Sequence, residues 1–346
     1  MRVYPFLFEP NLHPVIWGGT QLRPYKGLAP SSEPIGESWE VSAVPSSTSI
    51  ISNGEWQGRD LVSVINEAPE AILGKKVNEQ YHGQLPLLVK FIDAKRDLSI
   101  QVHPNDEMAQ RVHGKMGKSE MWYIIKADPG AHLYAGFKQA ITPYEYQKRV
   151  EDGTITEVLA DHQVKAGDVF YLPAGRVHAI CGGILLAEVQ QSSDVTYRIF
   201  DYNRPGMDGK PRELHTELAA QALDYHVEEN YRTEYVDSDN SAVQIIDSPY
   251  FDVRVMEINR PMHRNLIKYD SFIITMCLQG DCRIKVRSTG EEVVLKEGYS
   301  ALIPAVLADY DVLPISGSSK ILDAFIDNMD RSFSHQVTRF LHITQQ

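Results

Sequence analysis

The chain has 346 residues, 43% of them hydrophobic and 23% charged, which is typical of a globular protein. This length predicts roughly two domains. The formal net charge of -12 argues against nucleic acid or an anionic membrane surface as the main partner, because like charges repel. A small anionic substrate can still bind where cationic side chains converge.

The sequence predicts a cytoplasmic protein. Its first residues carry Pro and Glu where a secretory signal has a continuous apolar segment, and no run of about 18 apolar residues predicts a membrane-spanning helix. The three cysteines, Cys181, Cys277 and Cys282, provide no disulfide framework of the kind common in exported proteins. We therefore expect no nucleic-acid or membrane partner, and either a monomer or a homodimer.

Short β-like segments separated by Gly, Pro, Asp and Asn dominate the chain. Their spacing is that of an all-β sandwich or barrel, so we predict a mainly β fold with short helical insertions. The expected strands lie within residues 85–94, 98–104, 120–127, 168–174, 184–191, 251–258, 271–280, 281–288 and 291–298.

Helical periodicity is found in fewer segments. Apolar residues recur at three- and four-residue intervals in 58–68, 105–113, 142–161 and 211–225. The third segment begins with Thr142 as an N-cap, Pro143 at the first helical position and Glu145 at the capping-box position.

A polar, turn-rich segment at about 229–243 suggests a domain boundary. We predict one domain over residues 1–235 and a degenerate second domain over 236–346. The halves share a pattern, Gly167-x5-Pro173 in the first and Gly298-x5-Pro304 in the second. Eleven residues after each Gly stand His178 and Asp309, and no His and Glu set precedes the second copy, which we interpret as structural.

The segment DLSIQVHPND, residues 97–106, raises the first question about function. Strand alternation places Ser99, Gln101 and His103 on one face and Leu98, Ile100 and Val102 on the other. Polar groups on one face of an apolar strand indicate either a hydrogen-bonded interior or half of a metal site.

The first Gly-Pro pattern extends to Gly167-x5-Pro173-x-Gly175-x2-His178, which resembles the second signature of the cupin β-barrel superfamily. In this pattern a Gly-led turn precedes a strand, Pro-x-Gly reverses the chain, and the His that follows points into the barrel. The resemblance implies two cupin-like jelly-roll β-barrel domains. Cupins usually add H-x-H and a nearby Glu, whereas this chain has Gln101-x-His103 and a displaced Glu120.

That departure is itself similar to the type I mannose-6-phosphate isomerases, in their short bacterial form. Six blocks occur in the order of that family: VIWGG (15–19), GESWEVSA (36–43), LSIQVHPND (98–106), GKSEMWYII (117–125), YLPAGRVHAI (171–180) and AEVQQSSDVTYRIFDYNR (187–204). The resemblance implies a metal-dependent isomerase that interconverts mannose 6-phosphate and fructose 6-phosphate through an enediol-type intermediate.

The resemblance also implies one divalent ion per chain, usually zinc, held by Gln101, His103, Glu120 and His178. Two imidazoles and a carboxylate are a common catalytic zinc set, whereas an amide oxygen is an unusual zinc ligand. From the chemistry of the residues alone, Gln101 would contact a metal ligand and not the metal ion itself.

Further roles follow from the same blocks. Arg198 is expected to stabilise the oxygen charge of the intermediate, and Lys118, Glu188 and Asp194 to serve proton transfer and its positioning. For the substrate phosphate, the candidates are Arg204 and the Ser99 hydroxyl. Trp17 and Trp39 are expected to pack against the barrel from outside.

Two other functions use the same pocket. An iron-dependent cupin oxygenase would take up oxygen without sugar turnover, but it has no need for the Lys, Asp and Arg set. A non-enzymatic sugar-phosphate-binding cupin would bind the sugar without converting it.

Overall fold

The computed structural model describes residues 3–315 and 317–328, and it confirms a mainly β fold with short helical insertions. Four antiparallel sheets contain most of the strands. None of the described helices is long and apolar enough to cross a membrane.

The first half forms a seven-stranded and a five-stranded sheet. The seven-stranded sheet has the order β13 (Arg232–Thr233), β9 (Val169–Leu172), β6 (Glu120–Ala127), β11 (Ile184–Gln191), β4 (Leu87–Ala94), β2 (Leu12–Gly19), β3 (Ile35–Val41). The five-stranded sheet has the order β12 (Tyr197–Phe200), β5 (Ile100–Val102), β10 (His178–Ile180), β7 (His132–Phe137), β8 (Leu159–Gln163).

The second half repeats this arrangement with a six-stranded and a four-stranded sheet. The six-stranded sheet has the order β1 (Phe6–Leu7), β20 (Ser300–Ile303), β17 (Ile273–Gln279), β22 (Ser319–Phe325), β15 (Asp252–Ile258), β14 (Val243–Asp247). The four-stranded sheet has the order β16 (Met262–Asn265), β21 (Asp309–Pro314), β18 (Cys282–Val286), β19 (Glu292–Leu295). The order β9-β6-β11-β4 thus matches β20-β17-β22-β15, and β5-β10-β7-β8 matches β16-β21-β18-β19.

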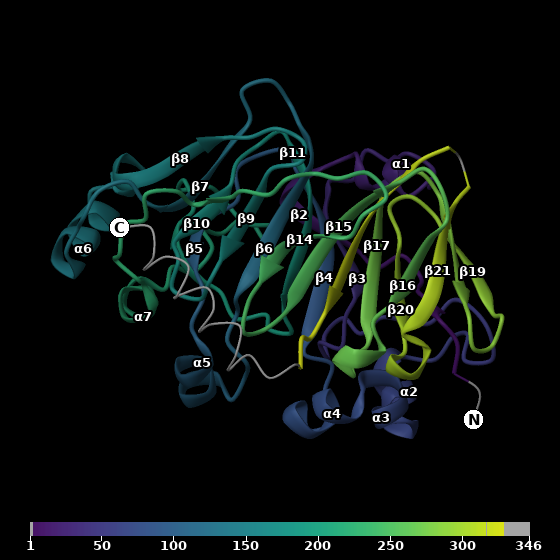
Figure 1. The fold of residues 1–346 in the computed structure, drawn as a ribbon. Helices are drawn as coiled ribbons and strands as arrows, with labels where there is room; N and C mark the ends of the chain where they lie inside the picture. Colours follow the sequence, from purple (N-terminus) through teal and green to yellow (C-terminus); the bar gives the residue numbers. More distant parts are fainter. Residues whose placement is uncertain (1–2, 316, 329–346) are drawn as a thin grey trace, which may run out of the picture.

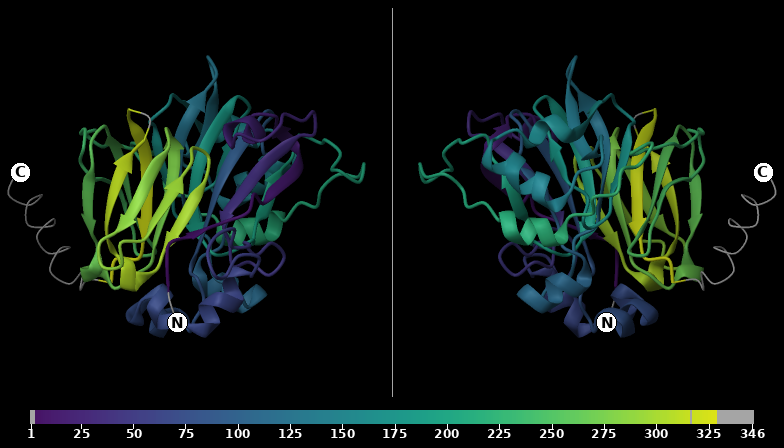
Figure 2. Two further views of the ribbon diagram at one scale, coloured as in Figure 1. Left: turned by 90° about the vertical axis from the view of Figure 1, so that its right-hand side faces the viewer. Right: turned by 90° about the vertical axis from the view of Figure 1, so that its left-hand side faces the viewer.

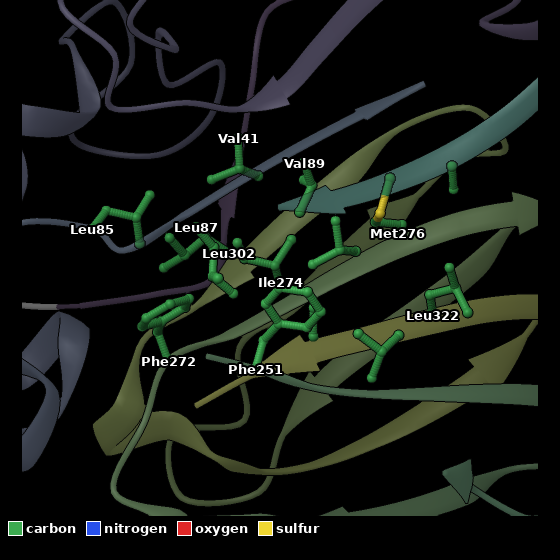
Figure 3. Packing of buried hydrophobic residues seen from close by; sticks show 14 of the residues in the cluster. Val41, Leu85, Leu87, Val89, Phe251, Phe272, Ile274, Met276, Leu302 and Leu322 are labelled. Carbon is green, nitrogen blue, oxygen red and sulfur yellow. The ribbon is translucent and has the colours of Figure 1, made fainter. Parts of the chain in front are cut away.

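Apolar clusters between the sheets show that they are stacked in the order five, seven, six and four strands. Figure 1 shows strands of the five-stranded sheet (β5, β7, β8 and β10) at the left and strands of the four-stranded sheet (β16, β19 and β21) at the right. One cluster joins the five- and seven-stranded sheets, and another joins the six- and four-stranded sheets. The cluster in Figure 3 lies between the two halves, where Val89 of β4 packs with Ile274 and Met276 of β17 and with Leu322 of β22. Burial of these side chains stabilises both halves together.

Helices cover the ends and one outer face of this stack. Met108 of α5, Tyr146 of α6 and Ala219 of α7 pack on the outer face of the five-stranded sheet, and residues of α2–α4 close the lower end of the seam between the halves. Figure 2 shows these helices from two further sides. The helices are α1 (Leu22–Tyr25), α2 (Leu61–Glu67), α3 (Pro69–Leu73), α4 (Lys75–Tyr81), α5 (Asp106–His113), α6 (Pro143–Glu151) and α7 (Thr216–Ala222), with 3-10 turns at Ile155–Val158, Ile267–Tyr269 and Ala305–Leu307.

Two expected helices are shorter than their sequence patterns. The segment 142–161 contains α6, which begins with the predicted capping box, but Gly153 has a φ of +68° and the chain continues into the 3-10 turn and β8. The pattern over 211–225 likewise yields only α7. After α6 the apolar spacing continues because the following residues are buried in another conformation, whereas the second pattern loses mainly residues 211–215, which precede α7 and are not buried.

The chain passes between the halves after β13, and β14 begins the second half. This agrees with a division near residue 235, except that β1 pairs with β20 and so places Phe6–Leu7 in the second half's sheet. The predicted second domain, 236–346, includes residues 329–346, which lie outside the described part. The division into two domains stays a prediction.

Candidate metal centre and active site

Two facing sheets bring three predicted metal ligands together. His178 is the first residue of β10 and His103 follows β5, both in the five-stranded sheet, while Glu120 is the first residue of β6 in the seven-stranded sheet. Their nearest possible ligand atoms lie within 4.8 Å of one another, and all three side chains are buried. This is the one such His, Cys, Asp and Glu group within residues 3–315 and 317–328.

Two glycines of the sequence motif shape the turns at the two ends of β9, and the second of these turns lies beside the cluster. Gly167 and Gly175 have φ angles of +90° and +92°, which L side chains rarely adopt. The N–H of Gly175 donates to the carbonyl oxygen of His103 at 2.9 Å, so the Pro-x-Gly turn is tied to the end of β5. The turn thereby sets His103 and His178 side by side, with ring centroids 4.8 Å apart.

Each imidazole is oriented by a main-chain carbonyl. His103 Nδ1 lies 2.9 Å from the oxygen of Val195, and His178 Nδ1 lies 2.8 Å from the oxygen of Arg176. Because a carbonyl only accepts, both Nδ1 atoms carry the proton and both Nε2 atoms present lone pairs. These Nε2 atoms lie 3.4 Å (His103) and 3.2 Å (His178) from the Glu120 carboxylate.

The protonation states suit a cation site. Burial, followed by the neighbouring Lys118 ammonium, lowers the pKa of His103 to about 3, and burial lowers the pKa of His178. Burial alone would raise the pKa of Glu120, but the neighbouring Lys118 ammonium outweighs it and holds this pKa well below its usual range. Two neutral imidazoles therefore face one carboxylate. His178 Nε2 has no hydrogen-bond partner among the described residues.

Lys118 lies inside this cluster. Its Nζ donates to Glu120 Oε2 at 2.6 Å and lies 3.0 Å from His103 Nε2, and the side chain is 8% exposed. The ammonium therefore supplies positive charge at the carboxylate.

Gln101 and Arg198 lie in one row with His178. Gln101 is directly opposite His178 on one side and Arg198 on the other. Directly opposite residues of antiparallel strands project to the same face, so the Gln101 side chain lies between those of His178 and Arg198. Arg198 Nη1 donates to the carbonyl oxygen of Glu213 at 2.9 Å, whereas its buried Nε lacks a partner in the described chain.

Glu188 belongs to a second row, across β6, β11 and β4. It lies opposite Trp122 and Lys90. Trp122 Nε1 donates to Glu188 Oε2 at 2.9 Å, and Lys90 Nζ is 3.3 Å from Glu188 Oε1. Burial and the nearby Glu120 charge raise the pKa of Glu188, against the opposing effect of Lys90.

The two tryptophans of the early blocks do not lie where we expected them. Trp17 is buried in the core between the five- and seven-stranded sheets, so the expectation that it packs from outside is wrong. Trp39 lies opposite Lys90, whose Nζ is 4.8 Å from the centre of its ring, and so extends the row of Glu188. Trp17 therefore packs inside the sandwich, whereas Trp39 is half-buried on β3 beside the polar row.

Asp194 is not part of the cluster. It lies beyond the end of β11, and Lys115 Nζ donates to its Oδ1 at 2.5 Å; both side chains are exposed. With Lys115 and Ser192, it lines a surface pocket of about 980 Å³ beside α2. Val195, which orients His103, is the next residue.

The predicted phosphate ligand Arg204 lies in a pair of arginines that shares one carboxylate. Arg204 donates from Nε and Nη2 to Asp201 Oδ1 at 3.1 and 2.9 Å, and Arg212 donates to both carboxylate oxygens at 2.7 and 2.6 Å. Arg204 and Arg212 both lower the pKa of Arg198, after the larger effect of burial. Ser99 is buried just before β5.

Sequence reasoning missed Lys90, Trp122 and Arg212. The first two were available as alternate residues of strands whose other face is apolar. Arg212 has no such signal, because it reaches Asp201 through a loop whose path depends on Tyr202 and Asn203 at positive φ.

Comparisons with known proteins agree with this geometry. The family model for the phosphomannose isomerase type I catalytic domain matches residues 6–163. The mannose-6-phosphate isomerase ManA of Bacillus subtilis is 34% identical over 90% of this chain and 96% of its own length. The mannose-6-phosphate isomerase of Streptococcus mutans is 33% identical over 88% and 94%.

Solved structures agree as well. The crystal structure of the mannose 6-phosphate isomerase from Bacillus subtilis has a TM-score of 0.81 and 31% identity, covering 93% of this chain and 99% of that one. A phosphomannose isomerase from Salmonella typhimurium, at 17% identity and a TM-score of 0.75, shares the fold. The expected architecture of cupin-like jelly rolls is thereby confirmed. The chain belongs to the type I phosphomannose isomerase family.

Proposed function

We propose that this protein is a metal-dependent aldose-ketose isomerase that interconverts mannose 6-phosphate and fructose 6-phosphate. One observation carries the proposal: His178 Nε2 and Glu120 Oε1, both acceptors, face each other at 3.2 Å in a buried site. Two buried acceptors repel unless a cation lies beside them. The named relatives favour an isomerase over an oxygenase or a sugar-binding protein.

For the metal we propose Gln101, His103, Glu120 and His178 as ligands and zinc as the ion. The imidazole lone pairs and the ionised carboxylate fit a divalent cation, and the register of Gln101 beside His178 supports its amide oxygen as the fourth donor. When bound, such an ion supplies Lewis acidity at the substrate oxygens.

Proton movement is proposed for Lys118 and Glu188. Both are buried, Lys118 contacts Glu120 and His103, and Glu188 has a pKa raised by burial, as suits a group that takes and returns a proton. Asp194 is proposed as a positioning residue. Its ion pair with Lys115 holds the chain next to Val195, whose carbonyl orients His103.

Arg198 is proposed to stabilise the negative oxygen of the enediol-type intermediate. It lies directly opposite Gln101 on the neighbouring strand, and its buried Nε–H has no hydrogen-bond partner in the described chain. A guanidinium that is half-buried and already oriented needs little rearrangement when negative charge develops beside it.

The phosphate is proposed to bind at Arg204 and Arg212 with the Ser99 hydroxyl. The two guanidiniums share one carboxylate, so together they keep a net positive charge in a protein whose overall charge is -12. Phe200, one residue before Asp201, lies opposite Ile100, which places this pair beside the strand that follows Ser99. We propose a cytoplasmic monomer or homodimer with the sugar phosphate as its partner.

The test uses the whole chain, its metal content and a coupled assay on mannose 6-phosphate. Wild type should contain about one divalent ion per chain and convert the substrate, and His178→Ala should lose the ion and more than about 100-fold of the rate while keeping its fold. His263→Ala is the matched control, because His263 pairs with Asp309 on the exterior. A His178→Ala protein with full metal and full rate would refute the ligand set.

A further inference from the structure

The inner face of the seven-stranded sheet changes from apolar to polar along β11. There, Ile184 and Leu186 belong to the core, whereas Glu188 and Gln190 follow at the same two-residue spacing. On the strands beside Gln190, Glu120 of β6 is polar and Leu88 of β4 is apolar. Gln190 is thus a buried polar residue of this face to which no role has been assigned.

Gln190 faces the metal cluster. It is fully buried and lies directly opposite Glu120 on the adjacent strand. Side chains of such a pair project to the same face, with Cβ atoms roughly 5 Å apart. The amide of Gln190 thus belongs to the interior in which the substrate must reach the metal ligands.

The amide is also fixed in orientation. Its Nε2 donates to the carbonyl oxygens of Gln191 at 2.8 Å and Ser193 at 2.7 Å. A flipped amide would place its oxygen against these two acceptors, so the two bonds determine which atom is which. The Oε1 atom therefore points away from the loop as an acceptor of fixed direction.

This Oε1 atom is buried and has no hydrogen-bond partner among the described residues. A buried acceptor without a partner is rare and costly, and it needs a donor from outside the chain. Sugar hydroxyls are such donors. The oxygens at C1 and C2 take part in the reaction, the phosphate occupies C6, and in the pyranose form the C5 oxygen closes the ring, which leaves the hydroxyls at C3 and C4.

We propose that Gln190 Oε1 accepts a hydrogen bond from the C3 or C4 hydroxyl of the bound hexose phosphate and so helps to select and align the substrate. This rests on the proposed isomerase function. Substrates that lack this hydroxyl leave the acceptor unpaired, and a site built this way discriminates against them.

The test compares Gln190→Met with Ser193→Ala. Methionine has similar length but no polar hydrogen bond to offer, while Ser193→Ala loosens the same loop by removing the Oγ bond to the carbonyl of Met116 at 2.8 Å. For each variant, the metal content, the thermal midpoint and kcat/KM on mannose 6-phosphate are measured, together with kcat/KM on its 3-deoxy and 4-deoxy analogues.

We expect Gln190→Met to keep its metal and to lose roughly tenfold in kcat/KM beyond Ser193→Ala, as for one hydrogen bond. On one of the two deoxy analogues the difference between wild type and Gln190→Met should disappear. Equal losses in both variants, loss of metal from Gln190→Met, or the same penalty on every substrate would each overturn the proposal.

Wild type alone provides a second measurement if Gln190→Met does not fold. It should be slower on one of the deoxy analogues, and equal rates on both analogues and on mannose 6-phosphate would overturn the role of Gln190. A wild type with metal but without any turnover of mannose 6-phosphate would instead refute the proposed function.

Discussion

Acceptor atoms that face one another distinguish this site from an ordinary buried polar cluster. Main-chain carbonyls accept hydrogen bonds from the Nδ1–H groups of His103 and His178, so the lone pairs of both Nε2 atoms face Glu120. Lys118 offsets part of this negative charge from one side. The opposite side, at His178 Nε2, keeps an acceptor without a partner in the described chain, which suits a metal ion better than a second ammonium.

Arg198→Ala should reduce kcat by about 100- to 1000-fold and change KM little, because the charge that Arg198 faces exists mainly in the transition state. Steady-state kinetics on mannose 6-phosphate measure both constants. Arg149→Ala is the control, since Arg149 pairs with Glu157 on the exposed side of α6. A rise in KM with unchanged kcat would show that Arg198 serves binding alone.

Trp122→Phe should move the acidic limb of the pH–rate profile to higher pH by roughly one unit. The indole N–H donates to Glu188 and favours its ionised form, so its removal adds to the effects of burial and Glu120, which already raise this pKa. A base must be ionised, and activity is therefore lost at a higher pH as the pH falls. Trp56→Phe, in the core between the halves, should leave the limb in place.

At the residue scale, the family resemblance predicted that His103, Glu120 and His178 come together, and the structure brings these three side chains and Lys118 into one cluster. The sequence could not show that Asp194 lies at an exposed ion pair, since the chain leaves the strand before that residue. The sequence also could not show that Arg204 and Arg212 bind the same carboxylate, because Arg212 reaches Asp201 only through the fold of the loop.

At the element scale, α6 shows how far local signals extend. The capping box of Thr142 and Glu145 was readable in the sequence and is present in the structure. The end of the helix was not, because the apolar residues after Gly153 are buried in the 3-10 turn and β8. A periodic pattern of apolar residues indicates which side chains are buried. It does not show where the helix ends, because the residues that follow can be buried in another conformation.

Thr142→Ala should lower the free energy of unfolding by about 1 kcal/mol, because the first turn of α6 loses a side-chain acceptor for the N–H of Glu145. Urea unfolding measures this change. Tyr144→Ala, on the same helix and 75% exposed, should change it by less than about 0.5 kcal/mol. Equal destabilisation by both variants would exclude the cap as the cause.

The same capping box predicts a pH dependence for α6. The backbone N–H of Thr142 lowers the pKa of Glu145, so the unfolded state binds the proton more readily. This contribution is complete above the ordinary glutamate pKa of about 4.3 and is lost as pH falls through the lower folded pKa. The protection factors of the α6 amides, which correct for the slower intrinsic exchange in acid, should fall over that range, and unchanged protection factors would contradict the prediction.

For the whole molecule, the repeated strand order explains why only one half carries the site. Tyr310 lies opposite Arg264 in the second half, as His178 lies opposite Gln101 in the first. Asp323, buried on β22, accepts from Thr275 Oγ1 at 2.7 Å, Tyr310 OH at 3.1 Å and Arg264 Nε at 3.1 Å. An internal ion pair thus occupies the polar interior of the second half.

Counting along the sequence could not find this arrangement. Eleven residues after Gly298 stands Asp309, which pairs with the exposed His263, and the buried position belongs to the next residue, Tyr310. The sequence predicted that the second half repeats the first. It could not predict the one-residue difference, because the faces of β21 are set by pairing with β16 and β18.

The core between the halves predicts that they unfold together. Ile274 is fully buried there, on β17 of the second half, and Ile274→Ala should cost about 2 to 5 kcal/mol. All four tryptophans, at positions 17, 39, 56 and 122, come from the first half of the chain, and only Trp56 belongs to the core between the halves, so tryptophan fluorescence reports mainly on the first half. The fluorescence midpoint should nevertheless shift to lower urea and coincide with the midpoint from circular dichroism.

Val294→Ala is the control. This residue is 41% exposed on β19, so its substitution should leave both midpoints in place. An unchanged fluorescence midpoint in Ile274→Ala would mean that the halves are independent, because a cavity in a shared core must destabilise both.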